Sequence, residues 1–312
     1  MNIKENFLNP AIFIILIAIT MFILSGCKND DDTCPETTWY QDFDNDGLGN
    51  PDISITDCVQ PLGYVNNNDD DNDTLDPSTQ LVFKDINSVY IGETYPLTIY
   101  LPRGYETKNL PVLYLLEGKT YYQDLITWSS DIDVEAIIVG IGDNLFEENF
   151  DKIARDYIPT SGTTAGHLNF YNFLIEEVVP YIDANYENDH EARTLIGFNP
   201  SGLFTNFSLL NKAPEDQFFK GFLSVDPQDR SRDIITDMVE NLSYSGDAKN
   251  IKIHISQVSG TSRADWFNNL LLAQEFPWLD IDFYTFEAED SEGIKPPVLE
   301  PSMKKGLQFI YK

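Results

Sequence analysis

The sequence has few positive charges, few histidines and few cysteines. Of its 312 residues, 20 are Lys or Arg and 51 are Asp or Glu, which leaves a formal net charge of −31. Such a chain repels the phosphates of nucleic acids, so we exclude nucleic acid as a partner. The excess of carboxylates suits divalent cations and cationic partners, but it equally describes a solvated, salt-screened surface. The charge alone therefore assigns no function.

The sequence does contain enough apolar residues for a folded protein. Hydrophobic residues make up 42% and aromatic residues 13% of the chain, which excludes disorder throughout. The length accommodates one α/β domain of roughly 200 to 250 residues together with a small extra module. We therefore expect two unequal folded parts.

The N-terminus has the pattern of an export signal. Lys4 precedes an apolar run from Ala11 to Leu24, which is too short for a comfortable membrane span and predicts a signal peptide over residues 1–26. The run ends in Leu24-Ser25-Gly26-Cys27, which resembles the bacterial lipobox. That resemblance implies acylation of Cys27 and anchoring to the membrane through its lipid. The alternative is a retained N-terminal helix with a chance cysteine.

A short acidic tether follows the cysteine. Lys28-Asn29-Asp30-Asp31-Asp32 is similar to the export signal of Bacteroidetes surface lipoproteins. The similarity implies that residues 27–32 send the protein to the bacterial outer membrane, lipid-anchored and facing outside the cell. Without that similarity, the five residues would be an ordinary polar linker.

Residues 33–80 are rich in Asp and Asn and poor in large apolar residues, so they need a ligand or a cross-link to fold. Asp42, Asp44 and Asp46 alternate and are followed by Gly47 and Gly49. This spacing presents carboxylates to one ion while glycine lets the backbone turn, and calcium is the cation that such ligands favour. The alternative is a disordered acidic linker.

A second acidic cluster runs from Asn66 to Asp73 and follows the sequence Cys58-Val59-Gln60-Pro61-Leu62-Gly63-Tyr64-Val65. Together the two clusters resemble the calcium-binding modules of bacterial surface proteins that are related to thrombospondin type 3 repeats. The resemblance implies structural calcium that stiffens a spacer, with the ligands Asp42, Asp44, Asp46, Asp69, Asp71 and Asp73. Asp71 stands where such modules carry a second cysteine, and Cys34 is the implied disulfide partner of Cys58.

From residue 81 to residue 312 the sequence alternates short β-rich runs with helical stretches, as in a mostly parallel sheet covered by helices on both faces. Leu168 to Tyr186 has the apolar period of a helix. The expected strands are Tyr95–Leu101, Val112–Leu116, Ala136–Ile141, Arg193–Ile196, Gly221–Val225, Ile251–Ile255 and Ile281–Phe286. The sequence therefore predicts an α/β domain.

Several of these segments resemble a family of esterases with the α/β-hydrolase fold, which includes siderophore esterases, feruloyl esterases and S-formylglutathione hydrolases. The segments are Leu97–Tyr105, Pro111–Gly118, Ile138–Ile141, Arg155–Pro159, Phe173–Ile182 and Gly306–Tyr311. The resemblance implies an α/β-hydrolase fold over residues 81–312. It also implies a serine nucleophile in a G-x-S-x-G turn, followed by an acid and a histidine.

The nucleophile turn lacks its serine. After the strand at Arg193, the chain reads Gly197-Phe198-Asn199-Pro200-Ser201-Gly202, with Asn199 in the place of the serine. Asn tolerates the left-handed conformation of such a turn, but its amide is not a nucleophile for esters. Pro200 lacks the N–H that the residue after the nucleophile donates to the oxyanion. We expect Ser201 to lie in the first turn of the next helix, without the geometry of the elbow, where it serves packing or capping. The alternative is that Ser201 is a displaced nucleophile.

The histidine and the acid of the triad are also missing from their expected places. The loop before the last helix, from Glu287 to Pro297, contains no histidine, and the segment from Ser256 to Ala264 contains no carboxylate. The three histidines are expected before a helix, in a loop and inside a strand: His167, His190 and His254. We expect all three to be structural or solvent-exposed.

Three functions follow from these features. The first is a non-catalytic binding or accessory subunit of an outer-membrane complex. The second is an ester hydrolase with altered catalytic residues, acting on siderophore, feruloyl or similar esters, for instance with a metal held by the acidic loop that contains Glu287, Glu289, Asp290 and Glu292. The third is a purely structural surface protein. The absence of a complete triad favours the first.

Overall fold

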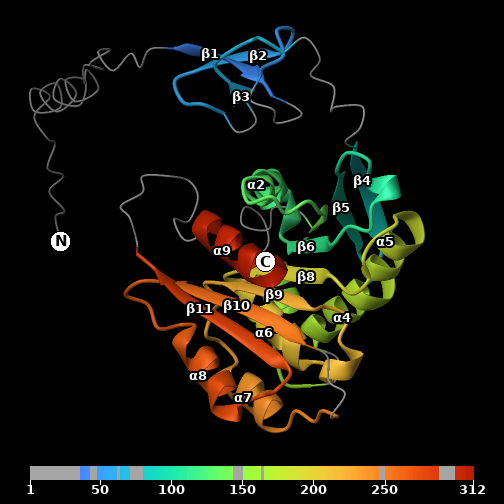
Figure 1. The fold of residues 1–312 in the computed structure, drawn as a ribbon, viewed down its shortest axis with the longest axis vertical. Helices are drawn as coiled ribbons and strands as arrows, with labels where there is room; N and C mark the ends of the chain where they lie inside the picture. Colours follow the sequence, from blue (N-terminus) through green and yellow to red (C-terminus); the bar gives the residue numbers. More distant parts are fainter. Residues whose placement is uncertain are drawn as a thin grey trace, which may run out of the picture. The chain divides into compact units, whose positions relative to one another are not determined.

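The computed structural model describes residues 36–42, 48–61, 64–70, 80–142, 150–162, 165–245, 250–287 and 299–312 (Figure 1). These residues form two compact units, one within residues 36–70 and one within residues 80–312. The predicted signal peptide, Cys27, the tether and Cys34 lie outside the described residues, as do Asp44, Asp46, Asp71 and Asp73. In the described part of the chain, every helix is too short or too polar to cross a bilayer.

The first unit is a small antiparallel sheet. Its strands, in the order β2-β1-β3, are β1 (Thr37–Gln41), β2 (Ser54–Asp57) and β3 (Tyr64–Val65). Gly49 lets two segments approach closely, because a Cβ there would lie 2.3 Å from the carbonyl oxygen of Asn67 and 2.6 Å from the Cβ of Tyr40. Cys58 is disulfide-bonded, and both other cysteines of the chain lie outside the described residues.

The second unit is built on an eight-stranded sheet with the strand order β11-β10-β9-β8-β6-β7-β5-β4. Strand β5 pairs antiparallel with both β4 and β7, while the other neighbours run parallel. The strands are β4 (Gln80–Asn87), β5 (Thr94–Leu101), β6 (Val112–Leu116), β7 (Ile137–Ile141), β8 (Arg193–Phe198), β9 (Gly221–Val225), β10 (Ile251–Val258) and β11 (Leu279–Phe286).

Helices cover both faces of this sheet. On one face α2 (Gly118–Ser130) and α9 (Leu299–Tyr311) pack on a core that includes Leu113 and Leu223. On the other face a larger core that includes Tyr114 and Phe222 is covered by the remaining helices. These are α3 (Phe150–Tyr157), α4 (Gly166–Phe173), α5 (Val179–Asn185), α6 (Pro200–Leu210), α7 (Arg232–Glu240) and α8 (Asp265–Gln274), with the π-helical stretch η2 (Leu174–Val178) between α4 and α5.

Successive strand residues alternate between these two cores, because neighbouring side chains point to opposite faces of a sheet. In β6, for example, Leu113 and Leu115 face α2 and α9, whereas Val112 and Tyr114 face α4 and α6. The central strands are therefore apolar along their whole length, as expected of a parallel sheet buried on both sides. The predicted α/β fold with covered faces is confirmed.

The seven predicted strands and the long helix are all present, and the ends of β6 and β9 agree with the prediction, whereas those of the other strands are shifted. The largest shift is in β10, which continues to Val258 instead of ending near Ile255. Strand β4 was missed, because it is an edge strand whose middle residues, Lys84 and Asp85, are polar and exposed. Two short 3₁₀ turns, η1 (Tyr105–Thr107) and η3 (Pro214–Asp216), complete the described elements.

Candidate active site

Asn199 occupies a strained turn between β8 and α6, at the carboxyl end of the sheet. Its backbone has φ 56° and ψ −110°, a positive φ that non-glycine residues rarely adopt. Glycine at position 197 permits this turn, since a Cβ there would lie 2.1 Å from the carbonyl oxygen of Ser201. The shape of a nucleophile elbow is thus retained around an asparagine, as the sequence predicts.

The side chain of Asn199 is held by Gln228 from the loop after β9. Gln228 donates its backbone N–H to the Asn199 carbonyl oxygen at 3.1 Å, and its Nε2 donates to Asn199 Oδ1 at 2.8 Å. Both carbonyl groups of Asn199 therefore point toward one residue. Sequence analysis did not identify Gln228, because its role depends on the fold rather than on a motif.

Pro200 is the first residue of α6. A proline is well accommodated there, because the N–H of the first helical residue has no partner within the helix. In an esterase elbow the same N–H would point at the oxyanion of the tetrahedral intermediate. Proline at this position therefore does not destabilise the helix. Removing one hydrogen-bond donor to the oxyanion, however, typically reduces the catalytic rate by about 10² to 10³-fold.

Ser201 lies in the first turn of α6 and is fully buried, with contacts that exclude it as a displaced nucleophile. Its hydroxyl accepts a hydrogen bond from Phe198 N–H at 2.9 Å and lies 3.0 Å from both the Phe198 carbonyl oxygen and Glu117 Oε2. An attacking hydroxyl must reach a substrate, and this one reaches only protein atoms. Ser201 therefore ties the elbow to the end of β6, which is the packing role expected for it.

Glu117 contacts Ser201, just after the elbow, and it could not be identified as a site residue from a sequence motif. It follows β6, has a left-handed backbone with φ 57°, and is fully buried. Burial raises the pKa of its carboxyl from 4.5 to about 7, an effect that the hydrogen bond from Ser201 partly offsets. At neutral pH the group is therefore close to half-protonated in the folded protein.

The turn at Glu117 is fixed by a close approach of two backbones. A Cβ on Gly118 would lie 2.2 Å from the Cα of Gly140 in β7. Only glycine fits at this point, and it brings the first turn of α2 against the sheet. The position of the Glu117 carboxyl therefore follows from helix packing rather than from an exposed loop.

The described histidines do not reach the elbow. His167 lies inside α4, where it is buried and packs edge-on against Phe207, rather than before the helix as predicted. His190 is exposed in a turn, 3.9 Å from Asp183. His254 lies in β10 beneath α9. Their structural or exposed roles agree with the sequence analysis.

His254 does belong to a group that has the composition of a catalytic triad. Its Nδ1 lies 2.7 Å from Asp282 Oδ2, and its Nε2 lies 3.3 Å from the hydroxyl of Ser302. However, both His254 and Ser302 are fully buried between the sheet and α9, where Ser302 also contacts Ser256. A substrate cannot enter this packed layer, so we interpret the group as a hydrogen-bond network that attaches α9 to the sheet.

Two carboxylates lie near the expected acid position. Asp265 begins α8 and accepts a hydrogen bond from Gln257 Nε2 at 2.8 Å. Asp226 follows β9, one strand away, and is buried with its Oδ2 3.7 Å from Arg263. Burial raises the pKa of Asp226, and Arg263 partly offsets this shift. Neither carboxylate contacts any of the three described histidines, so no acid–histidine pair forms at the elbow among the described residues.

The acidic loop proposed for a metal-assisted reaction falls mostly outside the described residues. Glu287 is described and exposed, whereas Glu289, Asp290 and Glu292 are not described. Where the structure describes the chain, it contains no group of three or more His, Cys, Asp or Glu side chains placed to hold a metal ion. The metal-assisted alternative therefore gains no support from the described geometry.

The small unit buries two carboxylates. Asp42 and Asp70 are 6% and 5% exposed. Hydrogen bonds link the segments that carry them through residues 49 and 50, because Asp70 N–H donates to the Gly49 carbonyl at 3.2 Å and Asn50 N–H donates to the Gln41 carbonyl at 2.8 Å. Of the predicted ligands in the described residues, Asp42 is therefore buried and Asp69 is exposed. Asp70 is a buried carboxylate that the sequence analysis did not select.

The sheet order, the helices on both faces and the strained turn after β8 define an α/β-hydrolase fold. Residues 88–273 match the model of the family described as "Putative esterase". The chain therefore belongs to this esterase family.

Several solved structures have the same fold. The BES protein from Bacillus cereus is 23% identical, covering 75% of this chain and 95% of its own, with a TM-score of 0.60. The enterobactin and salmochelin hydrolase IroE is 20% identical over 75% of this chain and 96% of its own, with a TM-score of 0.58. The siderophore hydrolase EstB from Aspergillus nidulans is 15% identical, with coverages of 75% and 94% and a TM-score of 0.56. At these identities the likeness shows the fold alone.

Proposed function

We propose that this protein is a catalytically degenerate member of the esterase family, and that it serves as a non-catalytic binding or accessory subunit of an outer-membrane complex. The observation that carries the proposal is the elbow itself. Asn199 holds the strained position of the nucleophile, and its carboxamide is bound to Gln228. The following residue, Pro200, cannot donate to an oxyanion.

The remaining groups near the elbow do not restore the lost chemistry. Hydrolysis by a triad needs a nucleophile, a base in hydrogen-bond contact with it, and a group that orients the base. Ser201 is buried against Glu117, and the three described histidines lie in other parts of the fold. Without these groups, little beyond binding and positioning remains to accelerate a reaction.

We further propose that the protein is anchored to the outer membrane through lipid on Cys27 and faces outside the cell. Two features of the sequence support this location: the lipobox-like Leu24-Ser25-Gly26-Cys27 and the acidic tether that follows it. A binding subunit of a surface complex needs such an anchor, and several acyl chains hold a protein stably.

Calcium is the proposed structural ligand of the N-terminal unit. The donors present fit this ion, because Asp42 and Asp70 supply carboxylate oxygens inside a small unit. A buried carboxylate is stabilised by a cation. The predicted ligands Asp42, Asp44, Asp46, Asp69, Asp71 and Asp73 would hold the calcium, and Cys34 is the proposed partner of Cys58.

Ester turnover tests the function. Protein lacking residues 1–27, assayed with calcium and aryl esters of short acids, is expected to hydrolyse them no faster than buffer does. The matched variants are Asn199→Ser with Pro200→Leu, which restores a hydroxyl and an N–H, and Asn199→Ala. If the parent shows saturable turnover above that of buffer, the proposal is wrong, whether or not Asn199→Ala abolishes that turnover.

The alternative, an ester hydrolase with altered catalytic residues, predicts saturable turnover by the parent protein in the same assay. It would need a nucleophile other than Asn199 or Ser201. No contact in the described residues favours this alternative over the binding function.

A further inference from the structure

Two cavities lie between α2 and strand β5, and the first of them is also lined by β4. The first, of about 330 Å³, is lined by Phe83 of β4, Thr98 of β5 and Tyr122 of α2. The second, of about 650 Å³, is lined by Tyr100 of β5 and Ile126 of α2. Neither lining includes Asn199 or Glu117, so this region is separate from the elbow.

The two cavities are neighbours, because residues of the same faces of β5 and α2 line both, and we refer to the two together as the groove. Thr98 and Tyr100 are two residues apart in a strand and therefore point to the same side. Tyr122 and Ile126 are four residues apart in a helix and share one face. From Lys119 to Ser130, which line opposite ends of the groove, α2 rises by about 16 Å.

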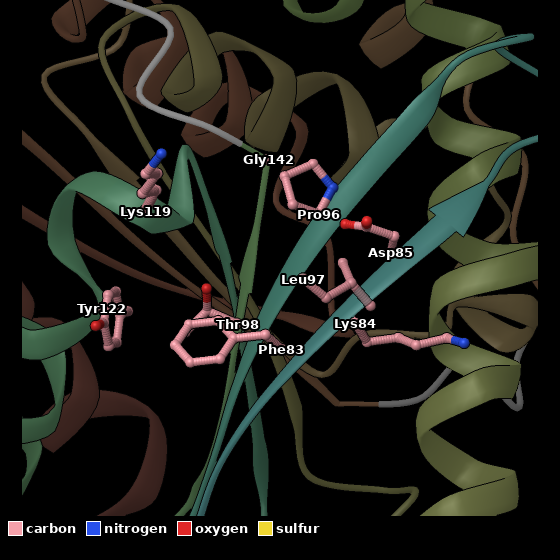
Figure 2. A pocket seen from close by; sticks show the side chains of 9 residues that line it. All are labelled: Phe83, Lys84, Asp85, Pro96, Leu97, Thr98, Lys119, Tyr122 and Gly142. Atoms are coloured by element: carbon pink, nitrogen blue, oxygen red, sulfur yellow. The ribbon is translucent and has the colours of Figure 1, made fainter.

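Figure 2 shows the first end of this groove. Phe83 and Thr98, which pair across β4 and β5, lie on the side of the sheet that faces Tyr122, whereas Lys84 points to the other side. Phe83 is 68% exposed, an unusual exposure for a large aromatic side chain. The end of the groove therefore has an aromatic ring on each wall.

The second end of the groove carries carboxylates. Asp131, Asp133 and Glu135 belong to its lining, and each lies within 4.0 Å of a lysine: Lys304, Lys312 and Lys108, respectively. An ionised carboxylate has about four acceptor sites, so one lysine does not exhaust it. The side chain of Asp133 is 96% exposed. These groups can accept hydrogen bonds from ligand hydroxyls.

The floor of the groove argues against a peptide that binds as an added strand. Strand β5 is already paired with β4 on one side and β7 on the other, so its backbone N–H and C=O groups are used within the sheet. A peptide strand needs such groups along a free edge, which in this sheet is the outer side of β4 and not the β5 floor of the groove. The groove offers side chains instead, with apolar rings at one end and hydrogen-bond acceptors at the other.

We infer that this groove binds a neutral oligosaccharide, with the apolar face of a sugar ring on Phe83 and Tyr122 and hydroxyl groups on Thr98, Asp131 and Asp133. A neutral ligand is not repelled by a protein with a net charge of −31, whereas an anionic ligand is. A ligand of several units matches the length of the groove. The inference goes beyond the proposed function and holds whether or not the elbow is catalytic.

Saturation-transfer NMR with cellotriose, maltotriose and xylotriose tests this inference on the protein lacking residues 1–27. We expect at least one trisaccharide to bind, and Phe83→Ala to weaken its binding about tenfold. Tyr122→Ala should act similarly. The matched control is Val89→Ala, which removes a side chain that is 82% exposed and outside the groove, and it should leave binding unchanged.

Benzoate and an uncharged hexapeptide serve as competing probes. The inference is overturned if none of the three saccharides binds, if benzoate or the peptide binds in their place, or if Phe83→Ala leaves saccharide binding intact. Phe83 makes a suitable test residue, because truncating an exposed side chain changes folding little. Ester turnover is not part of this readout, so failure here is distinguishable from failure of the proposed function.

Discussion

Replacing Glu117 with glutamine is expected to stabilise the esterase-like unit at pH 8 and to leave it almost unchanged at pH 4.5. In the folded protein, burial raises the pKa of Glu117 from 4.5 to about 7. Below pH 4.5 the carboxyl is protonated in both the folded and the unfolded state, so its ionisation does not lower the free energy of unfolding there. Between pH 4.5 and about 7 the unfolded state ionises first, and the free energy of unfolding falls by roughly 3 kcal/mol.

Glutamine has nearly the same shape as glutamate and does not titrate. Glu117→Gln should therefore remove the fall in the free energy of unfolding as the pH rises. Urea unfolding of both proteins at pH 4.5 and pH 8 measures it directly. Glu135→Gln is the matched control, because Glu135 is a half-exposed glutamate bound to Lys108. Parallel stability profiles for wild type and Glu117→Gln would show that the Glu117 carboxyl is not desolvated as described.

Removing calcium is expected to unfold the N-terminal unit while the esterase-like unit stays folded. A ligand present at 100 times its dissociation constant stabilises the folded state by about 2.7 kcal/mol. A small three-stranded unit has little core with which to compensate for that loss. Limited proteolysis after EDTA treatment should therefore cut within residues 36–70 and spare residues 80–312.

Asp42→Asn should reproduce the effect of EDTA in the presence of calcium, because Asp42 is buried and a neutral amide is a weaker calcium ligand. Asp52→Asn changes an exposed carboxylate in the same unit and serves as the control. If EDTA leaves the proteolysis pattern unchanged, the calcium proposal is wrong, whatever the variants do.

The fold could be predicted from the sequence because its signals are local and repeated. Strands such as β6 and β9 are short apolar runs between turns, and their predicted bounds agree with the structure. Strand β4 could not be found in this way, because an edge strand exposes one side and Lys84 and Asp85 interrupt its pattern. Its position depends on pairing with β5, which a local pattern does not encode.

The residues of the candidate site are likewise of two kinds: those that a local sequence pattern reveals and those that only the fold brings together. Asn199 and Pro200 could be identified because the elbow motif has fixed spacing. Glu117 follows β6, whereas Asp226 and Gln228 both follow β9, and only the folded sheet brings these two strand ends near the elbow. One signal for Glu117 was available, since a carboxylate directly after a wholly apolar strand is costly to bury and marks a special environment.

The most direct test of the central claim is the intact mass of the protein after incubation with a fluorophosphonate, which bonds covalently to activated serine hydroxyls. We expect an unchanged mass, because Asn199 stands at the elbow and Ser201 is buried against Glu117. A stoichiometric phosphonyl adduct, mapped by peptide sequencing to any serine of the domain, would contradict it and identify the protein as a serine hydrolase with an unrecognised nucleophile.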